Sequence, residues 1–210
     1  MDRDILKYCR KGTRIKSMKM DSALNNARHT GMAYQPESKT EGFVIWLTGL
    51  SGSGKTTTGR ILEKYFREKG SRVEFLDGDE LRRTISSELG FSKEDRETHA
   101  RRVAYLSQLL SRNGVITIVA LISPYRAFRE YARTLAGNFV EVWVQCSLET
   151  CVKRDPKGLY KNASQGNITN MTGIQAPYEP PLNPEVSINT EKESPQECAE
   201  RIIEYLNGTK

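Results

Sequence analysis

The sequence predicts an α/β fold in which helices cover both faces of a five-stranded parallel sheet. Two observations lead to this prediction. Five short apolar runs alternate along the chain with stretches whose apolar residues recur at helical spacing. The first run, FVIWLT at residues 43–48, is apolar throughout, as expected of a strand covered on both faces. Repeated strand–helix alternation of this kind is typical of parallel sheets.

The five expected strands are runs rich in β-branched and aromatic residues. They are residues 43–48, 72–76, 115–122, 139–146 and 186–189. The expected helices have apolar residues three or four positions apart. They are residues 56–69, 79–89, 93–113, 125–136, 148–154 and 195–206. In the first of them Ile61, Leu62, Tyr65 and Phe66 share one face, and Gly70 follows the last residue.

One stretch without helix or strand periodicity, residues 155–184, is polar and rich in glycine and proline. Loops of such length are uncommon in compact domains unless they have a function. We therefore expect residues 155–184 to form a mobile lid.

The charge is unevenly distributed. Residues 1–41 hold nine Lys and Arg against five Asp and Glu, whereas residues 42–210 hold 23 against 21. Most of the formal net charge of +6 therefore lies in the first fifth of the chain. We expect a basic N-terminal extension at residues 1–41 and one domain at residues 42–210. Because the domain is nearly balanced, nucleic acid is not expected as the main ligand.

Composition also bears on the compartment. The chain has no run of 18 apolar residues, so a membrane-spanning helix is not expected. Its four cysteines are scattered, with no spacing typical of a zinc site or of a disulfide framework. These features favour a cytoplasmic protein.

Residues 49–56, GLSGSGKT, match the phosphate-binding loop (P-loop) pattern G-x-x-x-x-G-K-[ST] in full. The motif lies between an expected strand and an expected helix, where backbone N–H groups and the helix N-terminus can hold phosphate oxygens. Lys55 would neutralise the β- and γ-phosphates, and the Thr56 hydroxyl would bind Mg²⁺. The motif predicts a P-loop NTPase fold that binds a nucleoside triphosphate.

Two carboxylates follow the second expected strand, in the sequence DGD at residues 77–79. In small P-loop kinases, carboxylates at this position serve the acceptor. Asp79 could orient an attacking hydroxyl or take its proton, and Asp77 could hold Mg²⁺. Asp79 could equally be the N-cap of the following helix.

Further blocks in the same order resemble the adenylylsulfate (APS) kinase family. They are DGDELR at residues 77–82, GFSKEDR at 90–96, ISP at 122–124, RDPKGLYK at 154–161 and TGI at 172–174. The resemblance covers residues 42–206. It implies transfer of the ATP γ-phosphate to the 3′-hydroxyl of adenosine 5′-phosphosulfate (APS), which gives 3′-phosphoadenylyl sulfate for sulfate assimilation. It further implies ATP and Mg²⁺ as cofactors, a homodimer and an association with ATP sulfurylase.

The resemblance assigns residues to four roles. Catalytic roles fall to Lys55, Asp79 and Ser123. ATP binding falls to Gly49, Leu50, Ser51, Gly52, Ser53, Gly54, Lys55, Thr56, Thr57 and Arg154. Acceptor binding falls to Asp79, Arg82, Phe91, Arg96, His99, Ile122, Ser123, Lys161, Met171 and Ile174. Metal binding falls to Thr56 and Asp77.

Physical chemistry supports several of these roles. The Arg82 and Arg96 guanidiniums match phosphate and sulfate oxygens. Phe91 would stack on adenine, although without the resemblance a core position would be favoured. Ser123 could form a transient phosphoserine, but direct in-line transfer is simpler and needs no covalent intermediate.

The chain departs from the family pattern at three positions. His99 stands where the family has Asn and could titrate near neutral pH. Met171 replaces an aromatic residue that would cover adenine, and Gln175 replaces Asp. These changes predict weaker or altered acceptor binding. Two alternatives therefore stay open: a P-loop kinase with a different small acceptor, or a nucleotide-binding partner domain with impaired catalysis.

Overall fold

The computed structural model describes residues 42–208, and the expected extension at residues 1–41 lies outside this range. Five strands form one parallel sheet in the order β2-β3-β1-β4-β5. They are β1 (Val44–Thr48), β2 (Val73–Asp77), β3 (Ile116–Ala120), β4 (Phe139–Gln145) and β5 (Val186–Asn189). The predicted five-stranded parallel sheet is confirmed.

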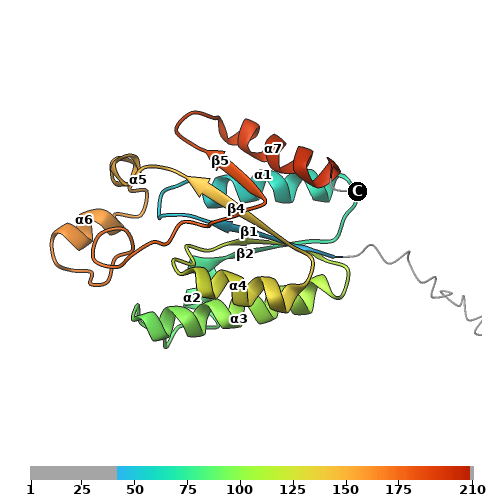
Figure 1. Ribbon diagram of the computed structural model, residues 1–210. Coiled ribbons are helices and arrows are strands. Elements are labelled where there is room, and N and C mark those ends of the chain that lie inside the picture. The colour runs from blue at the N-terminus through green and yellow to red at the C-terminus, as the bar shows by residue number, and fades with distance from the viewer. Residues whose placement is uncertain (1–41, 209–210) are drawn as a thin grey trace, which may run out of the picture. The chain divides into compact units, whose positions relative to one another are not determined.

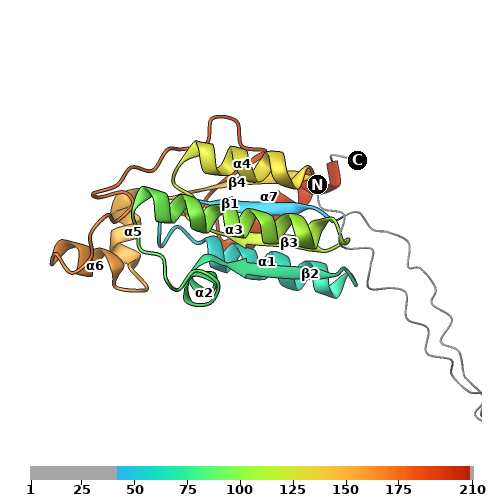
Figure 2. The ribbon, with the colours of Figure 1, turned by 90° about the horizontal axis from the view of Figure 1, so that it is seen from below.

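Helices lie on both faces of the sheet, as predicted (Figure 1). They are α1 (Lys55–Glu68), α2 (Gly78–Arg83), α3 (Lys93–Ser111), α4 (Arg126–Ala136), α5 (Leu148–Arg154), α6 (Leu159–Ser164) and α7 (Pro195–Gly208). Figure 1 shows α1 and α7 on one face, with α3 and α4 on the other. Figure 2 shows α3 and α4 in front of the strands when the sheet is seen from that side. No helix among residues 42–208 is both long and apolar enough to span a membrane.

The central strand β1 explains this three-layer arrangement. All five of its residues are buried, and successive side chains point to opposite faces. Ile45 packs in one core cluster with Leu62 of α1 and Ile202 of α7. Trp46 packs in a second cluster with Val103 of α3. A continuous apolar strand therefore holds two helical layers at once.

The expected helix at residues 79–89 is wrong in length, because α2 ends at Arg83. Side chains of α3 hold the turns that follow α2. The Arg102 guanidinium donates to the Ile85 carbonyl, and His99 Nδ1 is 3.0 Å from Ser86 Oγ. Residues 84–87 (TISS) are weak helix formers, so these tertiary contacts decide their conformation.

The 155–184 segment is not irregular throughout, because it contains the short helix α6. Tyr160 of α6 is 2% exposed and packs with Cys151 and Met171 in a third, smaller cluster. The Tyr160 hydroxyl donates to the Ser51 carbonyl over 3.0 Å. This segment is thereby attached to the P-loop.

The other boundaries agree with the expectations to within one or two residues. Because all strands are parallel, their carboxyl ends meet at one edge of the sheet, and α5 and α6 lie beyond this edge in Figure 1. The motifs singled out in the sequence follow these carboxyl ends.

Candidate active site

A cleft of about 1230 Å³ lies at the carboxyl edge of the sheet. Its walls come from the P-loop, the β2–α2 junction, the start of α3, the turn after β3, the 155–184 segment and the turn after β5. Ligands of open α/β sheets bind at this edge. The volume exceeds the range of roughly 300–1,000 Å³ typical of single small-molecule pockets. The cleft therefore has room for more than one ligand.

The P-loop has the backbone conformation that its glycines permit. Gly52 and Gly54 have φ angles of 76° and 100°, in the left-handed region that other residues rarely adopt. Gly54 is also the N-cap of α1. A Cβ atom on Gly54 would lie 3.2 Å from Cγ2 of Thr190, so a side chain at position 54 would press against Thr190 as well as strain the backbone. The loop ends at a helix N-terminus, which favours anions.

Lys55 lies beneath the loop and is 8% exposed. Its ammonium donates to the carbonyls of Gly49 (2.9 Å) and Leu50 (2.6 Å). Burial, together with the nearby Lys157 ammonium, lowers the pKa of Lys55 to about 8. A bound phosphate would give this buried cation a charged partner, and Lys55 lines the cleft where such a phosphate would bind.

Arg154 braces the outer side of the P-loop. Its guanidinium donates to the Thr190 carbonyl (2.6 Å), to Thr190 Oγ1 (3.0 Å) and to the Gly52 carbonyl (3.3 Å). Thr190 Oγ1 in turn donates to the Ser53 carbonyl (2.8 Å). Arg154 also lines the cleft, so it can both support the loop and contact a nucleotide.

Two oxygen donors lie together beside the loop. Thr56 Oγ1 donates to Asp77 Oδ2 over 3.1 Å, and both residues line the cleft. A hydroxyl and a carboxylate are the hard oxygen ligands that Mg²⁺ prefers, so these residues fit the predicted metal site. Asp77 Oδ1 also accepts from the backbone N–H of Asp79 (2.9 Å) and caps α2. The alternative in which Asp79 caps this helix is therefore wrong.

The Asp79 side chain is free of a capping role and reaches the cleft. It forms an ion pair with Lys157 of the 155–184 segment, and both side chains are about half exposed. A carboxylate at this position can accept a proton from a bound hydroxyl.

A cationic and aromatic wall lies beside Asp79. Phe91 is 52% exposed, so the alternative core position is wrong. The Arg82 and Arg96 guanidinium carbons lie 4.7 and 5.5 Å from the centre of its ring. Burial lowers the pKa of both arginines, and within residues 42–208 neither forms an ion pair with a carboxylate. This wall suits an anionic ligand with a flat ring.

His99 is buried at the base of the cleft and is 2% exposed. Its Nδ1 is hydrogen-bonded to Ser86, whereas its Nε2 makes no hydrogen bond of good geometry within residues 42–208, although the Gly78 backbone lies near the ring. Burial, with the Arg82 and Arg102 guanidiniums, lowers the pKa of His99 to about 4. The expectation that it titrates near neutral pH is therefore wrong.

Ile122 and Ser123 line the cleft in the turn after β3, as expected. Ser123 is 2% exposed. Its Oγ accepts from Trp46 Nε1 (3.0 Å) and donates to Thr48 Oγ1 (3.1 Å). The serine hydroxyl is thus part of a buried hydrogen-bond network.

Met171 is 6% exposed and lines the cleft. Two other expected residues, Lys161 and Ile174, are exposed and lie outside the cleft lining. Gln175 Oε1 accepts from the Met171 backbone N–H (2.9 Å), so this hydrogen bond helps to fix the conformation of residues 171–175. Thr172 was not singled out as a site residue. It is 1% exposed, lines the cleft, and its hydroxyl has no partner in residues 42–208.

The remaining expected ATP-binding residues lie in the P-loop and in the first turn of α1. Ser51, Gly52, Gly54, Thr56 and Thr57 line the cleft. Gly49, Leu50 and Ser53 belong to the loop but lie outside the lining. Gly49 and Leu50 instead supply the carbonyls that hold Lys55.

Comparisons with known proteins point to one family. The family model described as adenylylsulphate kinase matches residues 41–189, more than half of the chain. A probable adenylyl-sulfate kinase of Pyrococcus abyssi is 55% identical over 163 residues, 78% of this chain and 94% of that protein. An adenylyl-sulfate kinase of Rippkaea orientalis is 52% identical, over 80% of this chain and 93% of that protein. The solved Mycobacterium tuberculosis APS kinase in complex with AMPPNP and APS is 40% identical, with a TM-score of 0.77. It covers 80% of this chain and 98% of its own.

Proposed function

Because this chain belongs to the adenylylsulphate kinase family, we propose that it transfers the γ-phosphoryl group of ATP to the 3′-hydroxyl of APS. The products are ADP and 3′-phosphoadenylyl sulfate. One observation carries the proposal for this chain: the P-loop and the Arg82–Phe91–Arg96 wall line the same cleft, with Asp79 on that cleft too. The M. tuberculosis relative solved with AMPPNP and APS supports the same pair of ligands.

The donor side of the cleft binds ATP through the P-loop. The Lys55 ammonium, now held by two carbonyls, would turn to the β- and γ-phosphates. Thr56 and Asp77 would hold Mg²⁺, which when bound screens the charge of the phosphates. Arg154 keeps the loop in shape through Thr190 and Gly52.

The acceptor side binds APS through charge and stacking. Arg82 and Arg96 would bind the oxygens of the phosphosulfate group, and Phe91 would stack on the adenine. The neutral His99 ring offers its Nε2 as one hydrogen-bonding atom. Met171 closes the pocket as an apolar but adaptable surface.

Transfer then proceeds in line. The 3′-oxygen of APS forms a bond to the γ-phosphorus, the bond from that phosphorus to the bridging oxygen of ADP breaks, and Asp79 takes the hydroxyl proton. For this step Lys157 must leave Asp79, and its ammonium can then pair with the phosphates. Because the Ser123 hydroxyl is buried and bonded on both sides, we assign it to positioning rather than to a phosphoserine intermediate.

The 155–184 segment acts as a lid in this proposal. Its contacts with the P-loop through Tyr160 and with Arg96 through the Asn170 carbonyl (2.6 Å) span both sides of the cleft. Closure over both ligands would exclude water and limit ATP hydrolysis.

We further propose a cytoplasmic homodimer that associates with ATP sulfurylase. Light scattering of the purified protein, with and without the sulfurylase, tests the two assemblies.

The function is tested by measuring ADP release under Mg-ATP with APS, adenosine or sugars as acceptor. Turnover with APS far above the others supports the proposal. Turnover with another acceptor supports the alternative of a P-loop kinase with a different small acceptor. No turnover with any acceptor supports the alternative of a nucleotide-binding partner domain with impaired catalysis. Asp79→Asn should lower kcat by about 10²-fold or more, with little change in the KM for ATP, if Asp79 handles the proton.

A further inference from the structure

The turn after β3 has a strained backbone. Ser123 has a φ of 39°, in the left-handed region that few residues other than glycine adopt. Such a conformation costs of order 1–3 kcal/mol and persists only where the surroundings hold it. Residues 122–124, here termed the acceptor turn, line the cleft directly. What holds this turn therefore matters to the acceptor site.

The side chain of Ser123 is one point of attachment. Besides its bonds to Trp46 and Thr48, the network includes Thr48 Oγ1 donating to the Ile122 carbonyl (2.7 Å). The Tyr178 hydroxyl lies 3.1 Å from Thr48 Oγ1. Burial raises the pKa of Tyr178 to about 12, so this hydroxyl keeps its proton. The chain of hydroxyls links the acceptor turn to the strand before the P-loop and to the 155–184 segment.

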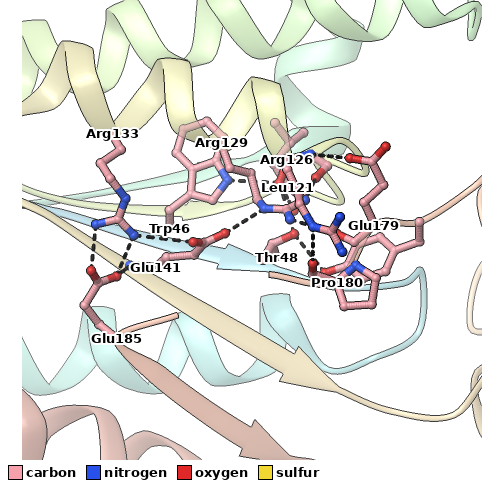
Figure 3. Close-up of polar contacts among 12 residues, drawn as sticks. Trp46, Thr48, Leu121, Arg126, Arg129, Arg133, Glu141, Glu179, Pro180 and Glu185 are labelled. Carbon is pink, nitrogen blue, oxygen red and sulfur yellow. Dashed lines mark hydrogen bonds and ion pairs between the residues drawn. The ribbon is translucent and has the colours of Figure 1, made fainter. Parts of the chain in front are cut away.

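The backbone of Ser123 is held by Arg129, which lies on α4 and is 2% exposed (Figure 3). Its Nη1 donates to the Ser123 carbonyl (2.6 Å) and its Nη2 to the Glu179 carbonyl (2.7 Å). Its Nε donates to Glu141 Oε1 (2.6 Å). One planar guanidinium thus binds three acceptors on three separate segments, which an ammonium cannot do in the same geometry.

Further hydrogen bonds join residues 178–180 to the end of the acceptor turn and to the start of α4. The Glu179 N–H donates to the Pro124 carbonyl (2.8 Å), and the Arg126 N–H donates to Glu179 Oε2 (2.9 Å). Arg126 Nε donates to the Pro180 carbonyl (2.8 Å). Residues 178–180, near the end of the 155–184 segment, are therefore bound to Pro124 at the end of the acceptor turn and to Arg126 at the start of α4.

The charge of Arg129 is balanced within a buried network. Glu141 also pairs with Arg133 (3.3 Å), and Arg133 binds Glu185 through both nitrogens (2.6 and 2.8 Å). Within residues 42–208 the Arg133 side chain binds Glu141 and Glu185 but neither the acceptor turn nor residues 178–180, as Figure 3 illustrates. The two arginines share one carboxylate and differ in whether they hold the acceptor turn.

We propose that Arg129 is a positioning residue for the acceptor site. It holds the strained acceptor turn and the end of the 155–184 segment as one unit, although it does not line the cleft itself. The proposal rests on the proposed function for its kinetic test. Loss of the Arg129 guanidinium should weaken binding of the acceptor more than binding of ATP, because other residues hold the P-loop.

The experiment compares Arg129→Lys with the matched control Arg133→Lys in the full-length chain. We expect Arg129→Lys to raise the KM for APS by about tenfold or more, with the KM for ATP changed by less than about twofold. Arg133→Lys should leave both values near those of the wild type. An unchanged KM for APS in Arg129→Lys, or equal effects of both variants, would overturn the proposal.

A second readout does not depend on the substrate. Amide hydrogen exchange should accelerate in peptides that contain residues 122–126 and 178–180 in Arg129→Lys and not in Arg133→Lys. If the wild type does not use APS, the proposed function fails while exchange still decides the role of Arg129. If Arg129→Lys does not fold, Arg129→Gln, which keeps two N–H donors, takes its place in both measurements. Exchange that is unchanged at both peptides contradicts the proposal.

Discussion

The buried side chain of His99 makes the free energy of unfolding depend on pH below neutrality. Its pKa falls from 6.5 to about 4, first through burial and then through the nearby Arg82 and Arg102 guanidiniums. Between these two pH values the unfolded chain takes up a proton that the folded protein does not. The contribution of the neutral His99 ring to the free energy of unfolding is therefore complete above pH 6.5 and is lost as the pH falls towards 4.

We predict that replacing His99 by Gln removes this pH dependence. Relative to the variant, the wild type should lose about 2 kcal/mol of unfolding free energy between pH 7 and pH 4.5. Urea unfolding of both proteins at the two pH values measures the difference, and the comparison cancels the titration of all other groups. Parallel losses in the two proteins would show that the folded histidine titrates normally.

Lys55 gives a prediction about the donor. The pKa of Lys55 is lowered to about 8 in the unliganded loop, mainly by burial. Bound phosphates favour the charged form and raise this pKa again. ATP binding should therefore be accompanied by proton uptake that is small at pH 7 and approaches one proton at about pH 9.

Calorimetric titration with ATP in buffers of different ionisation enthalpy measures this uptake. In Lys55→Arg the guanidinium stays charged throughout, so the uptake should vanish. Lys161→Met is the control, because Lys161 lies outside the cleft lining and the uptake should persist there. Uptake that survives in Lys55→Arg would assign the proton to another group.

At the scale of residues, local motifs were predictable and long-range partners were not. The P-loop residues follow one another, so their spacing alone indicates a phosphate site. The partners of Arg129 lie 6, 12 and 50 residues away along the chain. Its position in α4 is compatible with an exposed arginine as well as a buried one, and only the packed sheet brings its acceptors together.

Helix α1 depends on a glycine that the P-loop pattern does not include. A Cβ on Gly59 would overlap the Phe75 ring and lie 3.1 Å from Leu47 Cδ1. The Phe75 ring has little freedom to move, since it is 5% exposed and packs within the core cluster of β1, α1 and α7. The absence of a side chain at Gly59 thus sets how closely α1 packs on the sheet.

Gly59→Ala should therefore destabilise the protein. Overpacking costs about 1–3 kcal/mol, and the overlap with the Phe75 ring places this site in the upper half of that range. The gain in helix propensity is about 1 kcal/mol, so we expect a net loss of about 1–2 kcal/mol. Urea unfolding measures it. Lys64→Ala in the same helix is the control, since that side chain is 78% exposed and should change stability little. A Gly59→Ala protein as stable as the wild type would mean that Phe75 can move.

Element types were predictable here, but the shortest elements were not. The strands and long helices have clear periodicity, and their bounds agree closely with the structure. Helix α6 shows no clear helical periodicity in the sequence, because it has only six residues and is held by tertiary contacts of Tyr160. Helix α2 is shorter than expected because α3 side chains bind the residues after it.

At the scale of the whole molecule, parallel topology explains why dispersed motifs form one site. The motifs at residues 49–56, 77–82 and 122–124 each begin at or just after the end of a strand, so all reach the same edge of the sheet. The alternation of strands and helices predicts that edge. The order β2-β3-β1-β4-β5 and the size of the cleft depend on how the layers pack, and the sequence pattern does not contain them.

Among residues 42–208, those that line the cleft run from Ser51 to Pro195. The basic segment at residues 1–41, with its net charge of +4, lies before them. If that segment acts only by attracting anionic nucleotides, its effect must be electrostatic and must disappear with salt. Deletion of residues 1–41 should then leave kcat within about twofold of the full-length value, because the groups that react all remain.

The ADP-release assay on both chains, at low salt and at about 0.5 M salt, measures this effect. We expect any difference in KM between them to be confined to low salt, since the Debye length falls to a few ångströms at high salt. A loss of kcat by more than about tenfold at both salt concentrations would contradict the prediction. The segment would then shape the site through direct contacts rather than through its charge.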